Sequence, residues 1–174
     1  MTLLSKWLPR LAVAFLALAA LPATVCAQIY NVTGVMPVRT ELVTACTVSA
    51  DNLDFGAYAS NSPTPVQGQT TIHLLCGAGS TAELLLDAGS GPGGGSGNTE
   101  RRRMEQDAGK GTLGYDLFQD AGRTVHWGDR SGRDTLEVQT TGSQHTITIY
   151  GQIPAGQRAV DGTYSDTITL TILY

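Results

Sequence analysis

The sequence predicts an all-β protein, an antiparallel sandwich or barrel of short strands. Apolar and polar residues alternate along much of the chain, and no long stretch has the 3.6-residue period of a helix. Glycine and proline clusters separate the alternating stretches, and glycine makes up 21 of the 174 residues. With 41% apolar and 15% charged residues the chain does not have the composition of a disordered protein. Its net charge of −4 gives no electrostatic basis for binding nucleic acid or an anionic membrane.

The first 27 residues are predicted to be a secretory signal peptide. Two basic residues precede the apolar stretch 11–21, which is too short to span a bilayer as a helix. Small residues then fit a signal-peptidase site, so we expect cleavage between Ala27 and Gln28. A lipoprotein that begins at Cys26 is the weaker alternative, because valine precedes that cysteine. No later apolar run approaches 18 residues, so no transmembrane segment is expected.

The two cysteines that remain after cleavage, Cys46 and Cys76, are predicted to form a disulfide. Export places them in an oxidising compartment, and two cysteines allow one pairing. The alternatives are two free buried thiols or half of a metal site. No CxxC motif and no histidine cluster accompanies the cysteines, so neither a metal nor a cofactor is expected.

Alternating stretches after the first cysteine predict the strands of the sandwich. The clearest is the stretch 164–174, where apolar residues alternate with threonine and serine. On that pattern one face carries Tyr164, Ile168, Leu170, Ile172 and Tyr174. The other predicted strands, in chain order, are 70–76, 82–87, 113–118, 135–138 and 146–153.

The remaining motifs are interpreted as structural, and the chain is not expected to be an enzyme. The glycine-rich segment 90–97 lacks the GK[ST] of a phosphate-binding loop and the acid spacing of a calcium loop, so it is expected to be a flexible loop. The basic run 101–103 is expected to be a solvated strand end rather than a polyanion site. Trp127 is expected in the core or at a strand edge. The histidines, which have no metal-ligand spacing and are expected to be solvated or hydrogen-bonded, are His73, His126 and His145.

The segment 28–42 has a strand pattern of its own, ahead of the first cysteine. Pro37 within it has no N–H, so the strand there can be paired on one side only. An immunoglobulin-type sandwich has about seven strands, whereas the stretch ending at Tyr174 would be the sixth. The missing neighbour would leave an apolar groove with unpaired backbone groups, which a second copy's segment 28–42 could fill, giving an open head-to-tail fibre. The candidate donor-strand residues are Val32, Gly34, Met36, Val38 and Leu42, and the candidate groove residues are Ile168, Leu170, Ile172 and Tyr174.

Several short pieces, taken in order, resemble the spore coat protein U domain family, which is found in subunits of archaic (Csu-type) chaperone–usher pili. The resemblance covers essentially the whole mature chain. The pieces that carry it are VTG at 32–34, CTV at 46–48, LDFG at 53–56, Cys76 at a strand end, YDLF at 115–118, DAGRT at 120–124, WGD at 127–129, YGQIPAGQ at 150–157 and GTYSDT at 162–167.

The resemblance implies an incomplete immunoglobulin-like antiparallel β-sandwich over 43–174, with 28–42 as an N-terminal donor strand. It also implies a structural subunit, in the shaft or at an adaptor position, exported through the periplasm into a cell-surface fimbrium that serves attachment or biofilm formation. A periplasmic chaperone would lend the missing strand and contact Tyr174, and an outer-membrane usher would exchange that strand for the donor strand of a neighbouring pilus subunit, identical or different. The alternative is a secreted spore-coat or lectin-like surface-binding module that forms no fibres.

Overall fold

The computed structural model describes residues 36–41, 45–93 and 97–174. The chain divides into two units, Met1–Thr40 and Glu41–Tyr174, and the strands found in the described residues belong to the second. The predicted signal peptide lies outside the described residues, and so do the candidate donor residues Val32, Gly34 and Leu42. No helix in the described ranges is long and apolar enough to cross a membrane.

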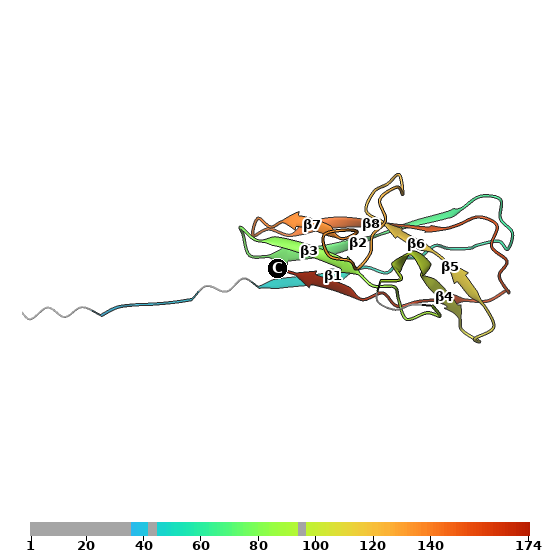
Figure 1. The fold of residues 1–174 in the computed structure, drawn as a ribbon, viewed down its shortest axis with the longest axis horizontal. Helices are drawn as coiled ribbons and strands as arrows, with labels where there is room; N and C mark the ends of the chain where they lie inside the picture. The colour runs from blue at the N-terminus through green and yellow to red at the C-terminus, as the bar shows by residue number, and fades with distance from the viewer. Residues whose placement is uncertain (1–35, 42–44, 94–96) are drawn as a thin grey trace, which may run out of the picture. The chain divides into compact units, whose positions relative to one another are not determined.

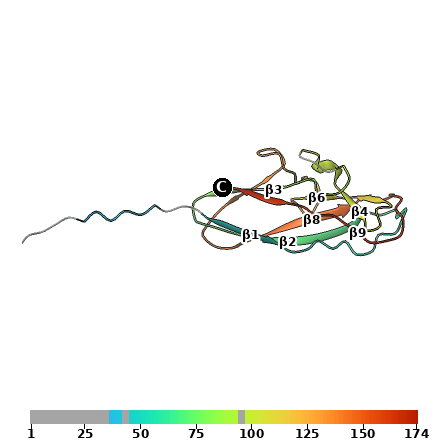
Figure 2. The ribbon, with the colours of Figure 1, turned by 90° about the horizontal axis from the view of Figure 1, so that it is seen from below.

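The second unit is an antiparallel β-sandwich, which confirms the predicted fold class (Figure 1). One layer is a four-stranded sheet in the order β1-β2-β8-β6, and the other is a three-stranded sheet in the order β10-β3-β7. Figure 2 shows β1, β2 and β8 in a layer below β3 and the C-terminal strand. A third, short sheet has the order β5-β4-β9. The strands are β1 (Cys46–Ala50), β2 (Val66–Cys76), β3 (Thr81–Leu86), β4 (Arg103–Gln106), β5 (Thr112–Gly114), β6 (Asp116–Phe118), β7 (Leu136–Gln139), β8 (His145–Ile153), β9 (Tyr164–Ser165) and β10 (Leu170–Leu173), and a single 3-10 turn, η1, spans Thr99–Arg101.

The core lies between the two layers and follows the alternation seen in the sequence. Ile72 and Leu74 of β2 face Leu84 and Leu86 of β3, and all four side chains are at most 1% exposed. Trp127 is fully buried among them, and its indole N–H donates to the Leu84 carbonyl at 3.0 Å. Trp127 is therefore a core residue whose one polar group is satisfied.

Two of the predicted strands are interrupted. The stretch 113–118 breaks at Tyr115 into β5 and β6, which belong to different sheets. The Tyr115 N–H still donates to the Arg102 carbonyl, in register with the pairing of β4 and β5, whereas Asp116–Phe118 pair with β8. Within 164–174 the segment 166–169 separates β9 from β10, and there side chains take over backbone hydrogen bonds. β1 and β4 are strands that the alternation did not predict; β1 is an edge strand, and β4 is the central strand of the short third sheet.

The predicted disulfide is present between Cys46 and Cys76, with an S–S distance of 2.05 Å. The two cysteines are register partners at the first residue of β1 and the last of β2. The bridge therefore fixes the edge strand β1, whose other side has no partner strand among the described residues.

Replacing both cysteines with serine is expected to lower the free energy of unfolding by about 3 kcal/mol, because the bridge closes a loop of 30 residues. Urea unfolding of the oxidised mature chain and of the double variant measures the difference. Wild-type chain treated with a reductant is the matched control and should unfold with the variant. A loss below about 1 kcal/mol would show that the bridge adds little to this sandwich.

The prediction that the basic run is solvated is wrong for Arg102, whose side chain is fully buried. Its Nε donates to the Asp87 carbonyl and its Nη2 to the Leu86 carbonyl, both at 2.8 Å. Its Nη1 lies 3.7 Å from Asp116 Oδ1. Burial lowers the pKa of this guanidinium. The carbonyl groups at the end of β3 thus bind a cation in the interior, although the basic run 101–103 was expected to lie at the surface. The neighbouring residues Arg101 and Arg103 are exposed.

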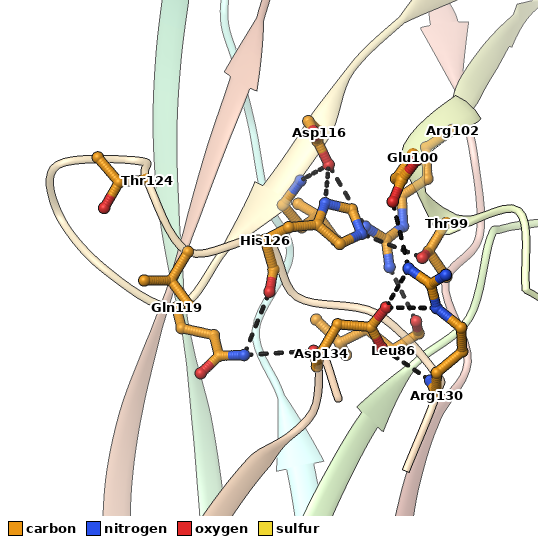
Figure 3. A network of polar contacts seen from close by, with 12 residues as sticks. Leu86, Thr99, Glu100, Arg102, Asp116, Gln119, Thr124, His126, Arg130 and Asp134 are labelled. Atoms are coloured by element: carbon orange, nitrogen blue, oxygen red, sulfur yellow. Dashed lines mark hydrogen bonds and ion pairs between the residues drawn. The ribbon is translucent and has the colours of Figure 1, made fainter. Parts of the chain in front are cut away.

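The three histidines all have polar partners, as expected. His126 lies between two elements: its Nδ1 is 2.9 Å from Asp116 Oδ1, and its Nε2 is 3.0 Å from the Thr99 hydroxyl (Figure 3). Asp116 is therefore shared by His126 and Arg102 in one polar cluster, of which Arg102 is fully buried and the other two side chains are partly buried. His73 contacts Gln144 and Asp51, and His145 contacts Thr141.

Candidate binding groove between the sheets

In the part of the chain that the structure describes, β1 and β10 are edge strands of the two layers, and the opposite edges are β6 and β7. β10 pairs only with β3, and β1 pairs only with β2. On β10 the carbonyl of Thr169, just before the strand, accepts from Asp87 N–H at 3.1 Å, so the odd-numbered residues bond toward β3. The N–H and C=O groups of the even-numbered residues, Ile168, Leu170 and Ile172, therefore point to the open edge.

On β1, too, the backbone groups of alternate residues point to the open edge. The Asp51 N–H donates to the Thr71 carbonyl and the Ala45 carbonyl accepts from Gly77, so odd-numbered residues bond toward β2. The open backbone groups belong to Cys46, Val48 and Ala50, whose side chains face the core side of the sheet. Val48 is 38% exposed although it lies opposite the fully buried Leu74. The inner face of β1 is thus incompletely covered.

A groove with a volume of about 450 Å³ lies between these edges. One wall is formed by residues 50–55, which are the last residue of β1 and the irregular segment after it, and the other is the C-terminal segment 164–170. The floor is mainly apolar and is formed by Leu86, Met104, Tyr115, Leu117 and Ile149. A second cavity of about 450 Å³ shares Leu53, Phe55, Met104 and Tyr164 with the first and extends to residues 159–163. We call the two cavities together the groove.

The groove residues predicted from the sequence differ in burial and in whether they line the groove. Ile168, Leu170 and Ile172 are half-buried and pack against the core, and the first two line the groove. Tyr174 is 61% exposed and does not line it. Of the candidate donor residues, Met36 and Val38 are described, and both are about four-fifths exposed: 80% and 82%.

Leu53 and Phe55 are groove residues that the alternation could not identify, because they lie outside any strand. They fit because two glycines, Gly68 and Gly151, are register partners beneath them in β2 and β8. A Cβ on Gly151 would come within 2.7 Å of both side chains. The one sign of these residues in the sequence was the piece LDFG at 53–56, which carries part of the family resemblance. The glycines that make room for it lie elsewhere in the sequence, at 68 and 151.

Asp166 is a carboxylate on the inner, otherwise apolar side of the C-terminal wall. Its Oδ1 accepts hydrogen bonds from the N–H groups of Ser90, Gly91 and Thr167 at 2.8, 2.9 and 2.7 Å, and from the Ser90 hydroxyl at 3.0 Å. Its Oδ2 accepts from the Tyr115 hydroxyl at 2.7 Å. Burial, together with this hydrogen bond, raises the pKa of Tyr115, which therefore stays a donor at neutral pH.

The start of the predicted glycine-rich loop is consequently tied to the groove wall; residues 94–96 lie outside the described residues. Gly91 is required here because a Cβ would lie 1.7 Å from the Arg103 carbonyl oxygen. Gly89 has a φ of +82°, and a Cβ there would meet the Asp166 carboxylate at 2.1 Å. Just before this loop, Asp87 Oδ1 accepts from the Thr169 N–H at 2.9 Å, which anchors the same wall a second time.

The arrangement has the chemistry of a peptide-binding site. Open ladder groups on two edges can bond an extended backbone, and the apolar floor can take alternate side chains from it. Within the described ranges, no group of three histidine, cysteine, aspartate or glutamate side chains could hold a metal ion.

Comparison with known proteins identifies a family model and a relative that match this chain. The family model described as Spore Coat Protein U domain matches residues 32–171. Protein U of Myxococcus xanthus is 33% identical over 140 residues, which cover 75% of this chain and 78% of that protein.

The comparison with solved structures found two pilus proteins. One is a chain of the CsuC–CsuE chaperone–tip adhesion subunit pre-assembly complex from the archaic chaperone-usher Csu pili of Acinetobacter baumannii, with a TM-score of 0.52 and 20% identity over 76% of this chain. The present chain spans only 40% of that chain, and the likeness concerns the fold. The other, HdaB, the minor tip subunit of the E. coli Hda pilus, has a TM-score of 0.41 and 15% identity over 72% of this chain and 79% of its own.

Proposed function

This chain belongs to the Spore Coat Protein U domain family, and we propose that it is a structural subunit of a chaperone–usher pilus. In this proposal the subunits polymerise by donor-strand exchange, and the fibre serves surface attachment or biofilm formation. The observation that carries the proposal is the groove, which has two unpaired strand edges above an apolar floor. An open edge of this kind is unstable in water and favours pairing with an added strand.

The occupant that we propose is the segment 28–42 of a second copy. Its even-numbered residues are mostly apolar, which matches a groove that takes every second side chain. To fill the groove beside its own β1, the segment would have to reverse direction within residues 42–45, Leu-Val-Thr-Ala, which contain none of the usual turn formers. Filling by another copy needs no such turn and produces a head-to-tail fibre.

The proposal includes the partners that such assembly requires. A periplasmic chaperone would cover the groove until an outer-membrane usher replaces the chaperone's strand with the segment 28–42 of the next subunit. The end of β10 is accessible for a chaperone contact, since Leu173 and Tyr174 are 46% and 61% exposed. The subunit would pass through the periplasm and end in a fimbrium on the cell surface.

A secreted surface-binding module without fibres is the second candidate, because the family model is named for a spore coat protein and the relative Protein U matches over 140 residues. It requires a groove that the chain fills by itself. The two candidates therefore differ in whether the mature chain is a stable monomer.

Deleting residues 28–42 is expected to abolish polymers of the mature chain, because the deletion removes the proposed donor strand. The mature chain and the deletion variant are refolded at high concentration and compared by size-exclusion chromatography and electron microscopy. A synthetic peptide 28–42 should then restore a one-to-one complex with the variant, whereas a peptide of the same composition in scrambled order should not. A full-length monomer that is stable and binds no peptide would contradict the fibre proposal and favour the second candidate.

A further inference from the structure

Resting on the proposed function, we infer that Met36 and Met104 are oxidation-sensitive sites on the two sides of the contact between donor segment and groove, and that conversion of either one to its sulfoxide blocks assembly. Of the three methionines in the sequence, Met1 belongs to the predicted signal peptide. After the expected cleavage the chain keeps two, one in the segment 28–42 and one in the groove floor. Both surfaces that must meet during assembly therefore carry an oxidisable thioether.

Met104 reaches both cavities of the groove from the short third sheet. Its neighbours in β4, Arg103 and Glu105, are exposed, so the Met104 side chain faces the other side of the strand, toward the core. There it is half-buried, packs against the core and lines the first and the second cavity. Because part of the side chain is exposed, a small oxidant can reach it while the groove is empty, whereas a docked strand would cover it.

Met36 is the corresponding methionine of the donor segment. It is 80% exposed. It is also one of the even-numbered apolar residues that a groove taking every second side chain would receive. Val38, the next even-numbered residue, is exposed to a similar extent but carries no oxidisable group. Met36 is thus open to oxidants before assembly and would be buried after it.

The modification is the transfer of one oxygen atom to the methionine sulfur by a peroxide. With hydrogen peroxide, a lone pair of the sulfur attacks one oxygen and the O–O bond breaks. The leaving hydroxide takes the proton of the transferred oxygen, so the products are one sulfoxide and one water. The sulfur is oxidised by two electrons and the peroxide is reduced by two. The flexible apolar side chain thereby becomes a polar one.

A sulfoxide at either position opposes docking for the same physical reason. Its oxygen is hydrated while the groove is empty and would lose that water under a docked strand. The floor beside Met104 supplies the apolar side chains of Leu86, Leu117 and Ile149. Burying a polar group without a compensating hydrogen bond is costly. Oxidants should therefore prevent new contacts between subunits, whereas contacts that have already formed should be protected.

Oxidation before refolding tests the block on assembly. The mature chain, with its disulfide intact, is treated with hydrogen peroxide in denaturant, freed of peroxide and refolded at a concentration at which the untreated chain polymerises. The yield of polymers is expected to fall about tenfold or more. The matched control carries Met36→Leu and Met104→Leu together, because leucine is similar in size and is not oxidised. Its yield should change by less than about twofold on the same treatment.

The single variants assign the effect to one side of the contact. Met104→Leu retains Met36, and Met36→Leu retains Met104, so each treated variant should still lose polymers about tenfold or more. Circular dichroism shows whether the treated chains keep the sandwich. If oxidised Met104 prevents folding, treated Met104→Leu tests Met36 alone, and the protection measurement below tests Met104.

Oxidation after assembly tests the protection. Finished polymers, and freshly refolded chain at a concentration too low for assembly, receive the same dose of peroxide. Mass spectrometry then follows the sulfoxide at each methionine over time. We expect Met36 and Met104 to be converted about ten times more slowly or less in the polymers, because susceptibility to oxidation follows exposure.

Three results would overturn the inference and leave donor-strand exchange intact. One is treated wild-type chain that polymerises as well as the treated control variant. Another is a control variant that loses its polymers on treatment, since the oxidant would then act on other groups. The third is a set of polymers whose methionines are oxidised as fast as those of the dilute chain. An absence of polymers from the untreated chain would overturn the proposed function, and the inference with it.

Discussion

Replacing Arg102 with methionine is expected to lower the free energy of unfolding by about 3–5 kcal/mol. Methionine fills a similar volume but donates no hydrogen bond, so the carbonyls of Leu86 and Asp87 lose the donors they have at 2.8 Å. The same change removes the cation 3.7 Å from Asp116 and leaves that carboxylate with His126 and the Leu117 N–H. Removing the buried cation costs more than its contacts contribute, because the Leu86 carbonyl in particular stays buried without a replacement donor.

The effect should reach the groove as well as the core. The carbonyls that Arg102 binds lie at the end of β3, where Leu86 is the register partner of Leu170 and the Asp87 side chain holds the Thr169 N–H. Loosening this corner should therefore also loosen the C-terminal wall. Hydrogen exchange at β10 is expected to rise in the variant even under conditions where the rest of the sandwich stays folded.

Urea unfolding followed by the fluorescence of the buried Trp127 measures the loss of stability. Arg101→Met is the matched control, since Arg101 is the exposed neighbour in the same run and should change the free energy of unfolding by less than about 0.5 kcal/mol. Equal stabilities of the two variants would show that the buried cluster does not stabilise the fold.

The sequence predicted those features that depend on local alternation. A period of two is visible within one stretch, so the inward-facing side of 164–174 could be assigned, and Ile168, Leu170 and Ile172 pack on the core as that assignment requires. The pairing of Cys46 with Cys76 could be predicted for a different reason, because two exported cysteines have one partner each.

Features that depend on contacts between distant residues could not be predicted. Arg102 is buried because of carbonyls fifteen and sixteen residues earlier in the chain, so its own neighbours gave no sign of it. Leu53 and Phe55 line the groove because Gly68 and Gly151 make room beneath them. The role of Asp166 could not be predicted either, since most of its donors come from residues 90–91 and from Tyr115.

Replacing Leu170 with glutamate is expected to weaken binding of the peptide 28–42 about 100-fold or more and to prevent polymer formation. Leu170 lines the groove and packs on the core, and its backbone groups point to the open edge. A carboxylate at this position stays hydrated while the groove is open. It would have to be buried without a partner when an apolar strand docks, and an unpaired buried charge costs several kcal/mol.

Thr171→Glu is the matched control for this prediction. Thr171 is the next residue of β10, but its side chain is exposed on the outer face, so the same charge there should leave peptide binding nearly unchanged. Circular dichroism of both variants establishes that each retains the sandwich before binding is compared by titration calorimetry. If Leu170→Glu kept its fold and still bound the peptide as tightly as Thr171→Glu, the donor strand would have to dock elsewhere, because no strand can lie along the open edge of β10 without covering Leu170.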